Sequence, residues 1–291
     1  MGDRGKACPA LAIIAATAGT ACASGRELAL FFAQLGWAGW LGIAFAGLTF
    51  GLLTGLLCRC AVRMDADSFA ALCSRMLGPR TAVVARWMQG ILLALAALVM
   101  LHGAGRLGEL ALPLRHGFAW GMAAALLLAL TMNLARLRPM PGLGLLLLTA
   151  GTAFYVALAL DARPVRVYLH GAVELALEGS VPAALLLALV YAAMNACVAA
   201  GVAVRFGRKA RPGRVGLACG LMLTTVLLCA NGAIARGGRT LLFQAMPTVL
   251  LAARWGVPGF WLCAILGFFS SVATLSATIS GLIDLAGEAR R

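Results

Sequence analysis

ALAIIAATAGTACASGRELALFFAQ, residues 10–34, decides the fold that we expect for this chain. The stretch is apolar and long enough to cross a bilayer, because a spanning helix needs about 20 residues. Its middle, residues 19–27, predicts an interruption: Gly19 and Gly25 lower the helix propensity, and two charged residues follow them. Such an interruption within the bilayer leaves peptide N–H and C=O groups that bind ions or small polar solutes. The sequence therefore predicts a first helix in two halves with a substrate or ion site between them.

The composition places the rest of the chain in the membrane as well. Of 291 residues, 62% are hydrophobic and 12% are charged, and the mean hydropathy is +0.95. Soluble domains carry about 25% charged residues. The net charge of +14 raises the question of nucleic acid, but the basic residues form short clusters between apolar runs, as in cytoplasmic membrane loops. We expect a polytopic protein whose partner is the lipid bilayer, and no nucleic-acid partner.

Seven further apolar runs are long enough to cross the bilayer. They lie at residues 37–57, 83–101, 118–134, 143–160, 182–204, 215–234 and 260–282. In the first of these, Gly47, Gly51 and Gly55 recur every fourth residue, which predicts a smooth helix face for close packing. The expected fold is an all-α polytopic membrane protein of about eight transmembrane helices, forming one domain over residues 1–291.

Two shorter segments are expected not to cross. Residues 69–77 follow Ser68 with apolar residues at i, i+3 and i+4, which predicts a short amphipathic helix on the membrane surface. Residues 241–253 are apolar but contain Pro247 and are too few to span, so they predict a re-entrant or lid-like hairpin.

Eight spans place both termini on one side of the membrane. The loops on that side, counted together with Arg86 near the start of the span 83–101, hold sixteen Lys and Arg residues, and the opposite loops hold seven. The positive-inside rule therefore predicts cytoplasmic N- and C-termini in the cell (inner) membrane. The first residues also have the basic start, apolar core and small residues of a secretory signal. Because that core is short and continues into another apolar half, we favour a retained first helix.

Glu27, at the end of the interruption, has two possible roles. Ser24 and Glu27 have the spacing of a capping box, in which they would close the start of the second half-helix. Alternatively, Glu27 is a titratable carboxylate that couples proton movement to transport, or a counter-charge for a cationic partner. The two interpretations are compatible.

Polar side chains on two later spans are candidates to face this site. Ser270, Thr274 and Thr278 recur every four residues, so they share one helix face, either as contacts between helices or as oxygen ligands for a hard cation. Tyr191 and Asn195 are one turn apart on another span, and either pack there or contact a solute. The chain lacks the sequence motifs of nucleophilic, zinc and P-loop enzymes, so we expect neither enzymatic activity nor a cofactor.

The segment Gly19-Thr-Ala-Cys-Ala-Ser-Gly-Arg-Glu27, followed by Phe31-Phe32, resembles the YkvI-type membrane proteins. Their first helix carries a similar G-A-G-F-A-S-G-Q-E break before F-F. Looser similarities cover most of the chain: Met100-Leu-His-Gly-Ala-Gly105, Tyr191-Ala-Ala-Met-Asn195, Met246-Pro247 and Ser270-Ser271. The family is usually placed with the amino acid–polyamine–organocation transporters, which have the LeuT-like fold.

This resemblance implies a five-plus-five inverted repeat, with the first repeat over residues 1–160 and an incomplete second repeat of three helices over residues 182–284, lacking the last two. It implies a Na+ site between the first and eighth helices. The cation ligands that it implies are Ala21, Cys22, Ser24, Ser270 and Ser271, and the solute-site residues that it implies are Tyr191 and Asn195. The helix patterns themselves add Thr274 as a candidate cation ligand, and the interruption adds candidate solute-binding residues at Gly19, Thr20, Ser24, Gly25 and Glu27. The family's Gln before the glutamate is Arg26 here, a fixed positive charge where a cation would bind.

We therefore expect a secondary active transporter of a small solute, similar to an amino acid or amine, coupled to Na+ or H+ by alternating access. The alternative is a transporter-like membrane receptor or accessory subunit that binds a small molecule without moving it. Either way a small-molecule solute is the expected partner, and the sequence leaves the oligomeric state open.

Overall fold

The computed structural model describes residues 9–23, 25–134, 141–161, 178–207 and 211–289, and in this part of the chain every regular element is a helix. Six helices are long and apolar enough to cross a membrane. They are α3 (Trp37–Arg63), α5 (Pro79–Ala111), α6 (Gly117–Leu134), α8 (Val181–Gly207), α9 (Pro212–Gly237) and α11 (Gly256–Ala289), the last taken with the short helices before it. The chain is an all-α polytopic membrane protein, as predicted.

Two of the eight predicted spans are not among these six. The first consists of α1 (Pro9–Ala23) and α2 (Arg26–Phe31), which are separate helices. The other is α7 (Pro141–Leu160), whose side chains are described from residue 145 onward. Within the described residues six helices are therefore candidate membrane spans by length and hydropathy, and the count of eight stays a prediction.

The first helix is interrupted, as predicted, but over fewer residues. We expected an interruption over residues 19–27, whereas α1 continues to Ala23 and α2 begins at Arg26. Gly25 takes a left-handed conformation, with φ of +70°. A glycine within a helix costs only about 1 kcal/mol relative to alanine, so Gly19 does not by itself unwind α1. The 3-10 turn η1 (Ala33–Leu35) then leads into α3.

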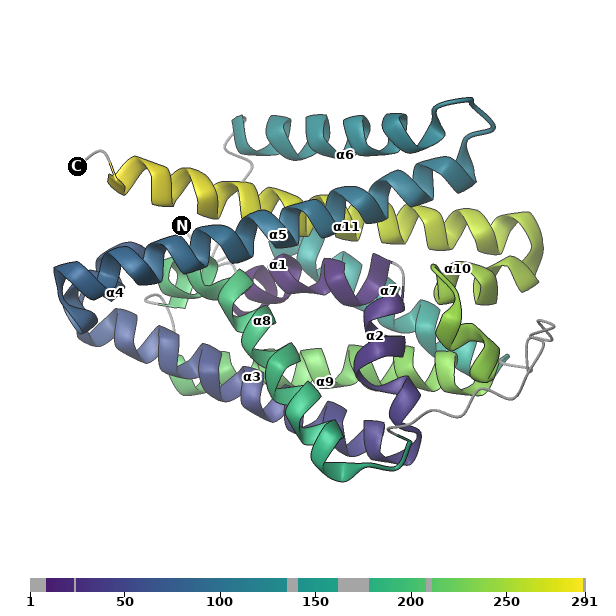
Figure 1. Ribbon diagram of the computed structural model, residues 1–291, viewed down its shortest axis with the longest axis horizontal. Helices are drawn as coiled ribbons and strands as arrows, with labels where there is room; N and C mark the ends of the chain where they lie inside the picture. The colour runs from purple at the N-terminus through teal and green to yellow at the C-terminus, as the bar shows by residue number, and fades with distance from the viewer. Residues whose placement is uncertain (1–8, 24, 135–140, 162–177, 208–210, 290–291) are drawn as a thin grey trace, which may run out of the picture.

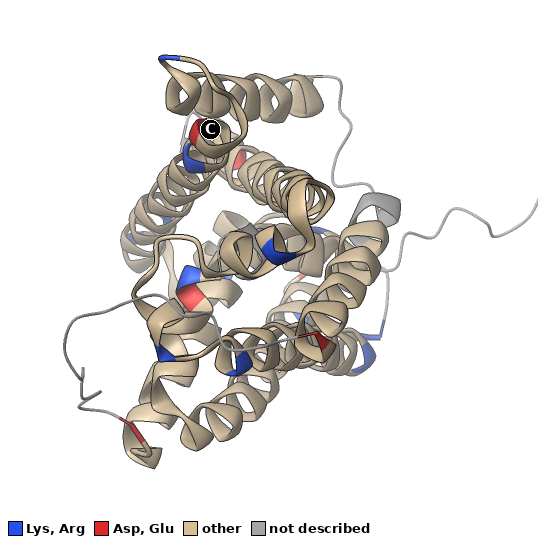
Figure 2. Ribbon diagram, turned by 90° about the vertical axis from the view of Figure 1, so that its right-hand side faces the viewer, with Lys and Arg blue, Asp and Glu red and all other residues tan. Residues whose placement is uncertain are grey.

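The helix α1 lies inside the bundle. It packs against α7, α8, α9 and α11, while α6 packs on the outside against α5 and α11. The start of α1 and the end of α11 lie at the same end of the bundle, which we call the terminal end (Figure 1). Most of the helix length carries no charged residue, as the tan ribbon of Figure 2 shows. A helix surrounded in this way can expose an interrupted backbone to protein instead of lipid.

The two segments predicted not to cross form short helices, and their position relative to the membrane stays a prediction. The helix α4 (Phe69–Leu77) has the predicted bounds, and the Oγ of Ser68 accepts a hydrogen bond of 3.1 Å from the backbone N–H of Ala71. Residues 241–253 fall in short helices: η2 (Arg239–Phe243), α10 (Pro247–Ala252) and η3 (Ala253–Trp255). These helices pack against α2, α9 and α11 at the end of the bundle opposite the termini.

The predicted smooth face of α3 is its contact with α9. A Cβ added to Gly51 would lie 2.8 Å from the carbonyl oxygen of Gly216, and one added to Gly216 would lie 2.5 Å from the carbonyl oxygen of Gly51. The two backbones thus approach each other too closely for any side chain. Gly55 has more space, with its nearest neighbours at 3.6 Å.

This contact predicts that Gly216→Ala destabilises the protein by about 1–3 kcal/mol, because the added methyl would overlap the backbone of α3. The matched control is Gly213→Ala on the same helix, since a Cβ there has no neighbour within 4 Å among the described residues. Thermal unfolding in detergent, followed by size-exclusion fluorescence, compares the two. Equal melting temperatures for both variants would contradict the close α3–α9 contact.

Candidate functional site

The interruption between α1 and α2 is enclosed by protein. Gly25 is buried, and a Cβ added to it would lie 2.5 Å from Cγ2 of Thr248 on α10 and 3.2 Å from Cδ1 of Ile234 on α9. The positive φ and the absence of space both require glycine at this position. The chain therefore turns between α1 and α2 directly against α9 and α10.

The second half-helix is attached to the segment that precedes α10. The guanidinium of Arg26 donates a hydrogen bond of 2.9 Å to the carbonyl oxygen of Gln244. Glu27 follows in the first turn of α2 and is half-buried. One fixed positive charge and one carboxylate thus lie beside the interruption. The residue that precedes α2 is Gly25, and the proposed cap Ser24 lies outside the described residues.

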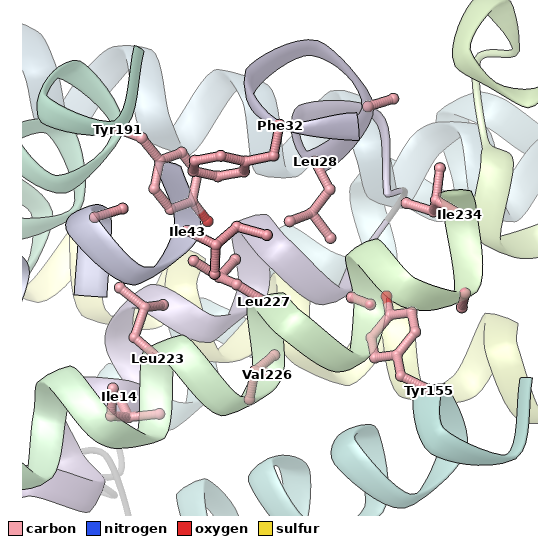
Figure 3. Close-up of a cluster of buried hydrophobic side chains, with 14 of the residues drawn as sticks. Ile14, Leu28, Phe32, Ile43, Tyr155, Tyr191, Leu223, Val226, Leu227 and Ile234 are labelled. Carbon is pink, nitrogen blue, oxygen red and sulfur yellow. The ribbon is translucent and has the colours of Figure 1, made fainter. Parts of the chain in front are cut away.

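Tyr191 packs against the end of α2. Its ring lies edge-on to Phe31 and Phe32, with ring centroids 5.3 and 5.2 Å apart. Figure 3 shows Tyr191 approaching Phe32 from α8, with Leu28 of α2 nearby. Asn195 is buried one turn further along α8, and its Nδ2 donates a hydrogen bond of 2.9 Å to the carbonyl oxygen of Tyr191. The structure therefore brings Tyr191 to the second half-helix, while the amide of Asn195 bonds to its own helix.

The predicted hydroxyl face of α11 is buried. Ser270, Ser271, Thr274 and Thr278 are each at most 2% exposed, and α11 packs along α1. The hydroxyl of Ser271 donates a hydrogen bond of 2.9 Å to the carbonyl oxygen of Gly267 in its own helix, as expected for a residue that only packs. The face is thus positioned toward the interior, next to α1.

The other half of the predicted cation site lies in the last turns of α1. Gly19, Thr20, Ala21 and Cys22 are helical, and their side chains lie outside the described part of the structure. Because α1 ends at Ala23, the carbonyl groups of its last turn have no donor within the helix. Carbonyl and hydroxyl oxygens are the ligands that hard cations take. The residues fit a Na+ site in their chemistry, and the site itself stays a prediction.

Two buried polar side chains near the interruption escaped the sequence analysis. Asn231 of α9 is 1% exposed, and among the described residues neither its Oδ1 nor its Nδ2 has a hydrogen-bond partner. Thr248 is fully buried against Gly25, and among the described residues its Oγ1 has no hydrogen-bond partner. The dipeptide Asn231-Gly232 has the composition of a turn, which hides its place inside a long apolar helix. The sequence signal that could have identified Asn231 was the presence of a side-chain amide in the middle of a predicted membrane span.

A small cavity lies toward the terminal end, between α4, α5, α8 and α11. Its volume is about 30 Å³, the share of one water molecule in the liquid. Arg205 of α8 and Asp284 of α11 form an ion pair on its wall, and the amide of Gln89 donates a hydrogen bond to the carbonyl oxygen of Cys197. These contacts close the bundle between α5, α8 and α11.

Polar contacts also connect neighbouring segments at the opposite end of the bundle. Arg239 of η2 pairs with Glu178 at 2.8 Å, and Nε1 of Trp255 donates a hydrogen bond of 2.7 Å to Asp161. Glu178 also lies against Gly36, the glycine that precedes α3. In this conformation the interruption therefore lies between two sets of charged contacts, one at each end of the bundle.

Neither a scan of protein-family models nor a search of curated proteins finds a match to this chain. The functional conclusion therefore depends on the geometry of these residues.

The turn at Gly25 predicts that Gly25→Ala destabilises the protein by about 2–4 kcal/mol, from the positive φ and the overlap with Thr248. Thr248→Ser removes the overlapping methyl and keeps the hydroxyl. The double variant should recover about 1–2 kcal/mol of the loss, because only the backbone strain remains. Thermal unfolding of the wild type, both single variants and the double variant measures this coupling. Strictly additive effects would show that Gly25 and Thr248 are not in contact.

The ion pair at the terminal end gives a second prediction. Asp284→Asn leaves the half-buried Arg205 without its carboxylate, and should destabilise the protein by about 1 kcal/mol. The control is Glu109→Gln, which breaks the more exposed Arg106–Glu109 pair and should stay within about 0.5 kcal/mol of the wild type. Unfolding midpoints compare the two. A larger loss for Glu109→Gln would contradict a structural role for the Arg205–Asp284 pair.

Proposed function

We propose that this protein is a secondary active transporter that moves a small solute by alternating access, coupled to Na+ or H+. The proposal depends on the interruption at Gly25, which lies inside the bundle against α9 and α10 and carries charged and polar groups around it. Broken helices with exposed peptide groups next to buried polar side chains are how many carriers bind their solutes near the bilayer midplane.

The proposed architecture is LeuT-like and related to the YkvI-type proteins, with α1–α2 and α7 completing eight spans. It is supported by the contacts of α1 with α8 and α11, which are the sixth and eighth spans in this count. The proposed location is the cell membrane with the termini in the cytoplasm, on the basis of the excess of Lys and Arg in the loops of that side.

Alternating access would open the two ends of the bundle in turn. The Arg205–Asp284 pair would separate when the terminal end opens, and the Arg239–Glu178 pair when the opposite end opens. Both pairs are partly exposed, and such pairs contribute only about 0–1 kcal/mol each, so a bound solute can shift the equilibrium between them. The coupling ion would be Na+ between α1 and the hydroxyls of α11, or H+ on Glu27.

The second candidate is a receptor or accessory subunit that binds a solute without moving it. The bond from Arg26 to the carbonyl of Gln244 favours it, because this bond holds the second half-helix to the segment before α10 with a permanent positive charge. A protein whose half-helix is held in this way binds its ligand but does not change access.

Uptake into proteoliposomes separates the two candidates. We expect gradient-driven accumulation of at least one solute from a panel of radiolabelled amino acids and amines, and none after the Na+ and H+ gradients are dissipated. A receptor would be stabilised by its ligand yet accumulate nothing.

If H+ is the coupling ion, Glu27→Gln should abolish the pH dependence of this uptake, because the amide does not carry a proton. Glu109→Gln, at an exposed position, serves as the control and should leave the pH dependence unchanged. A pH profile of Glu27→Gln that matches the wild type would leave Glu27 without a coupling role.

A further inference from the structure

An open groove lies on the outer surface of the bundle between α3 and α9. Its volume is about 810 Å³, and its lining residues fall between Ala44 and Arg59 on α3 and between Pro212 and Thr224 on α9. Gly51 and Gly216, which bring the two backbones together, form part of its lining. Both helices lie at the lower edge of the bundle in Figure 1.

The groove faces the lipid and not the interior of the protein. Both helices are candidate membrane spans. Five leucines of its lining are each more than half exposed: Leu48, Leu52, Leu56, Leu217 and Leu221. Since lipid tails are as apolar as leucine, an acyl chain satisfies such a surface.

The length of the groove matches one leaflet of a bilayer. At 1.5 Å per residue its lining covers about 22 Å along α3 and about 18 Å along α9. Half of the hydrocarbon core measures about 15 Å. One turn before Ala44, Trp40 lies across the two helices, because a Cβ added to Gly232 of α9 would lie 3.4 Å from Cη2 of its ring. The groove therefore accommodates one lipid tail and is shorter than a complete transmembrane helix of a partner.

The end of the groove at the terminal end of the bundle is basic. Arg59 lines it, Arg63 follows one turn further along α3, and Arg211 and Arg214 lie at the start of α9. All four side chains are exposed, and none of them forms an ion pair with a carboxylate of the described residues. The groove thus ends at a cluster of positive charge that the described part of the protein does not neutralise.

The same end offers a backbone donor. Gly213, the second residue of α9, lines the groove, and its N–H has no acceptor within the helix. Free N–H groups at a helix N-terminus bind phosphate, and an arginine forms strong charge-assisted hydrogen bonds with it. Arg59 and Gly213 together therefore suit a phosphate group at the end of an apolar groove.

Charge favours a lipid over a second copy of the chain. Two copies in one membrane, related by a two-fold axis along the membrane normal, would meet through this groove with the same ends together. Their unpaired arginines would then lie opposite each other, and like charges across an interface are unfavourable. An anionic headgroup would instead neutralise them.

We propose that the groove between α3 and α9 binds a phospholipid with an anionic headgroup, with one acyl chain along the groove and the phosphate beside Arg59 and the N–H of Gly213. This inference requires a membrane-spanning chain and does not depend on transport. The lipid would contact both helices and so stabilise their packing.

The test is thermal unfolding of the delipidated full chain in detergent with single probes. We expect dioleoylphosphatidylglycerol at saturation to raise the melting temperature by about 3 °C. Dioleoylphosphatidylcholine, which has the same chains without a net charge, and inorganic phosphate, which has no chain, should each leave it within about 1 °C.

Two variants separate the headgroup from the chain. Arg59→Gln should reduce the shift from phosphatidylglycerol to that from phosphatidylcholine, whereas Arg80→Gln, at an exposed position of α5 that does not line the groove, should keep it. Gly213→Leu fills the groove and should also abolish the shift. Its control is Gly103→Leu on α5, because a Cβ at either glycine has no neighbour within 4 Å among the described residues.

Four outcomes would overturn the inference. The two lipids stabilise the wild type equally, inorganic phosphate alone reproduces the shift, Arg80→Gln loses as much of it as Arg59→Gln, or the lipid-free protein is a dimer that Gly213→Leu dissociates. Light scattering after size exclusion measures the last of these, and would assign the groove to a second copy. If Gly213→Leu does not fold, the comparison of Arg59→Gln with Arg80→Gln still decides.

Discussion

The constraint on which this structure depends is that peptide groups inside a membrane must find hydrogen-bond partners within the protein. Helices satisfy the constraint over almost the whole described chain. Between α1 and α2 it is locally broken, and the released groups must be enclosed by other helices. This explains why α1 lies inside the bundle, and why Gly25 packs directly on Thr248 and Ile234. The need to enclose the interruption therefore explains why other helices surround α1.

Features with a local cause could be predicted from the sequence. The bounds of α4 followed from Ser68 and an amphipathic pattern, and the break was predicted because Gly19 and Gly25 lower the helix propensity and two charged residues follow them. The extent of the break could not be predicted. Gly19 costs a helix only about 1 kcal/mol, and whether α1 continues past it depends on packing against α11 and other helices distant in sequence.

In the candidate site too, features with a local cause could be predicted, and features that depend on tertiary packing could not. Tyr191 was found because it forms a polar pattern on one span, although the pattern did not reveal that its ring would meet Phe31 and Phe32. Asn231 and Thr248 were not found, because their significance is tertiary. An asparagine before a glycine has the composition of a turn, and only the packing of α9 against α2 shows that its amide is buried near the break. The predicted cation ligands in α1 have side chains outside the described residues and stay a prediction.

The energetics connect the site to the proposed motion. The ion pairs at the two ends are partly exposed, and each stabilises its end by only about 0–1 kcal/mol. A solute therefore needs to bind only about 1 kcal/mol more tightly to one arrangement than to the other to offset the cost of separating one pair. A ligand shifts a conformational equilibrium only through its different affinity for the two states. In the proposed transporter, a solute that binds more tightly while both ends are closed would favour that arrangement, and its release would follow when either end opens to water.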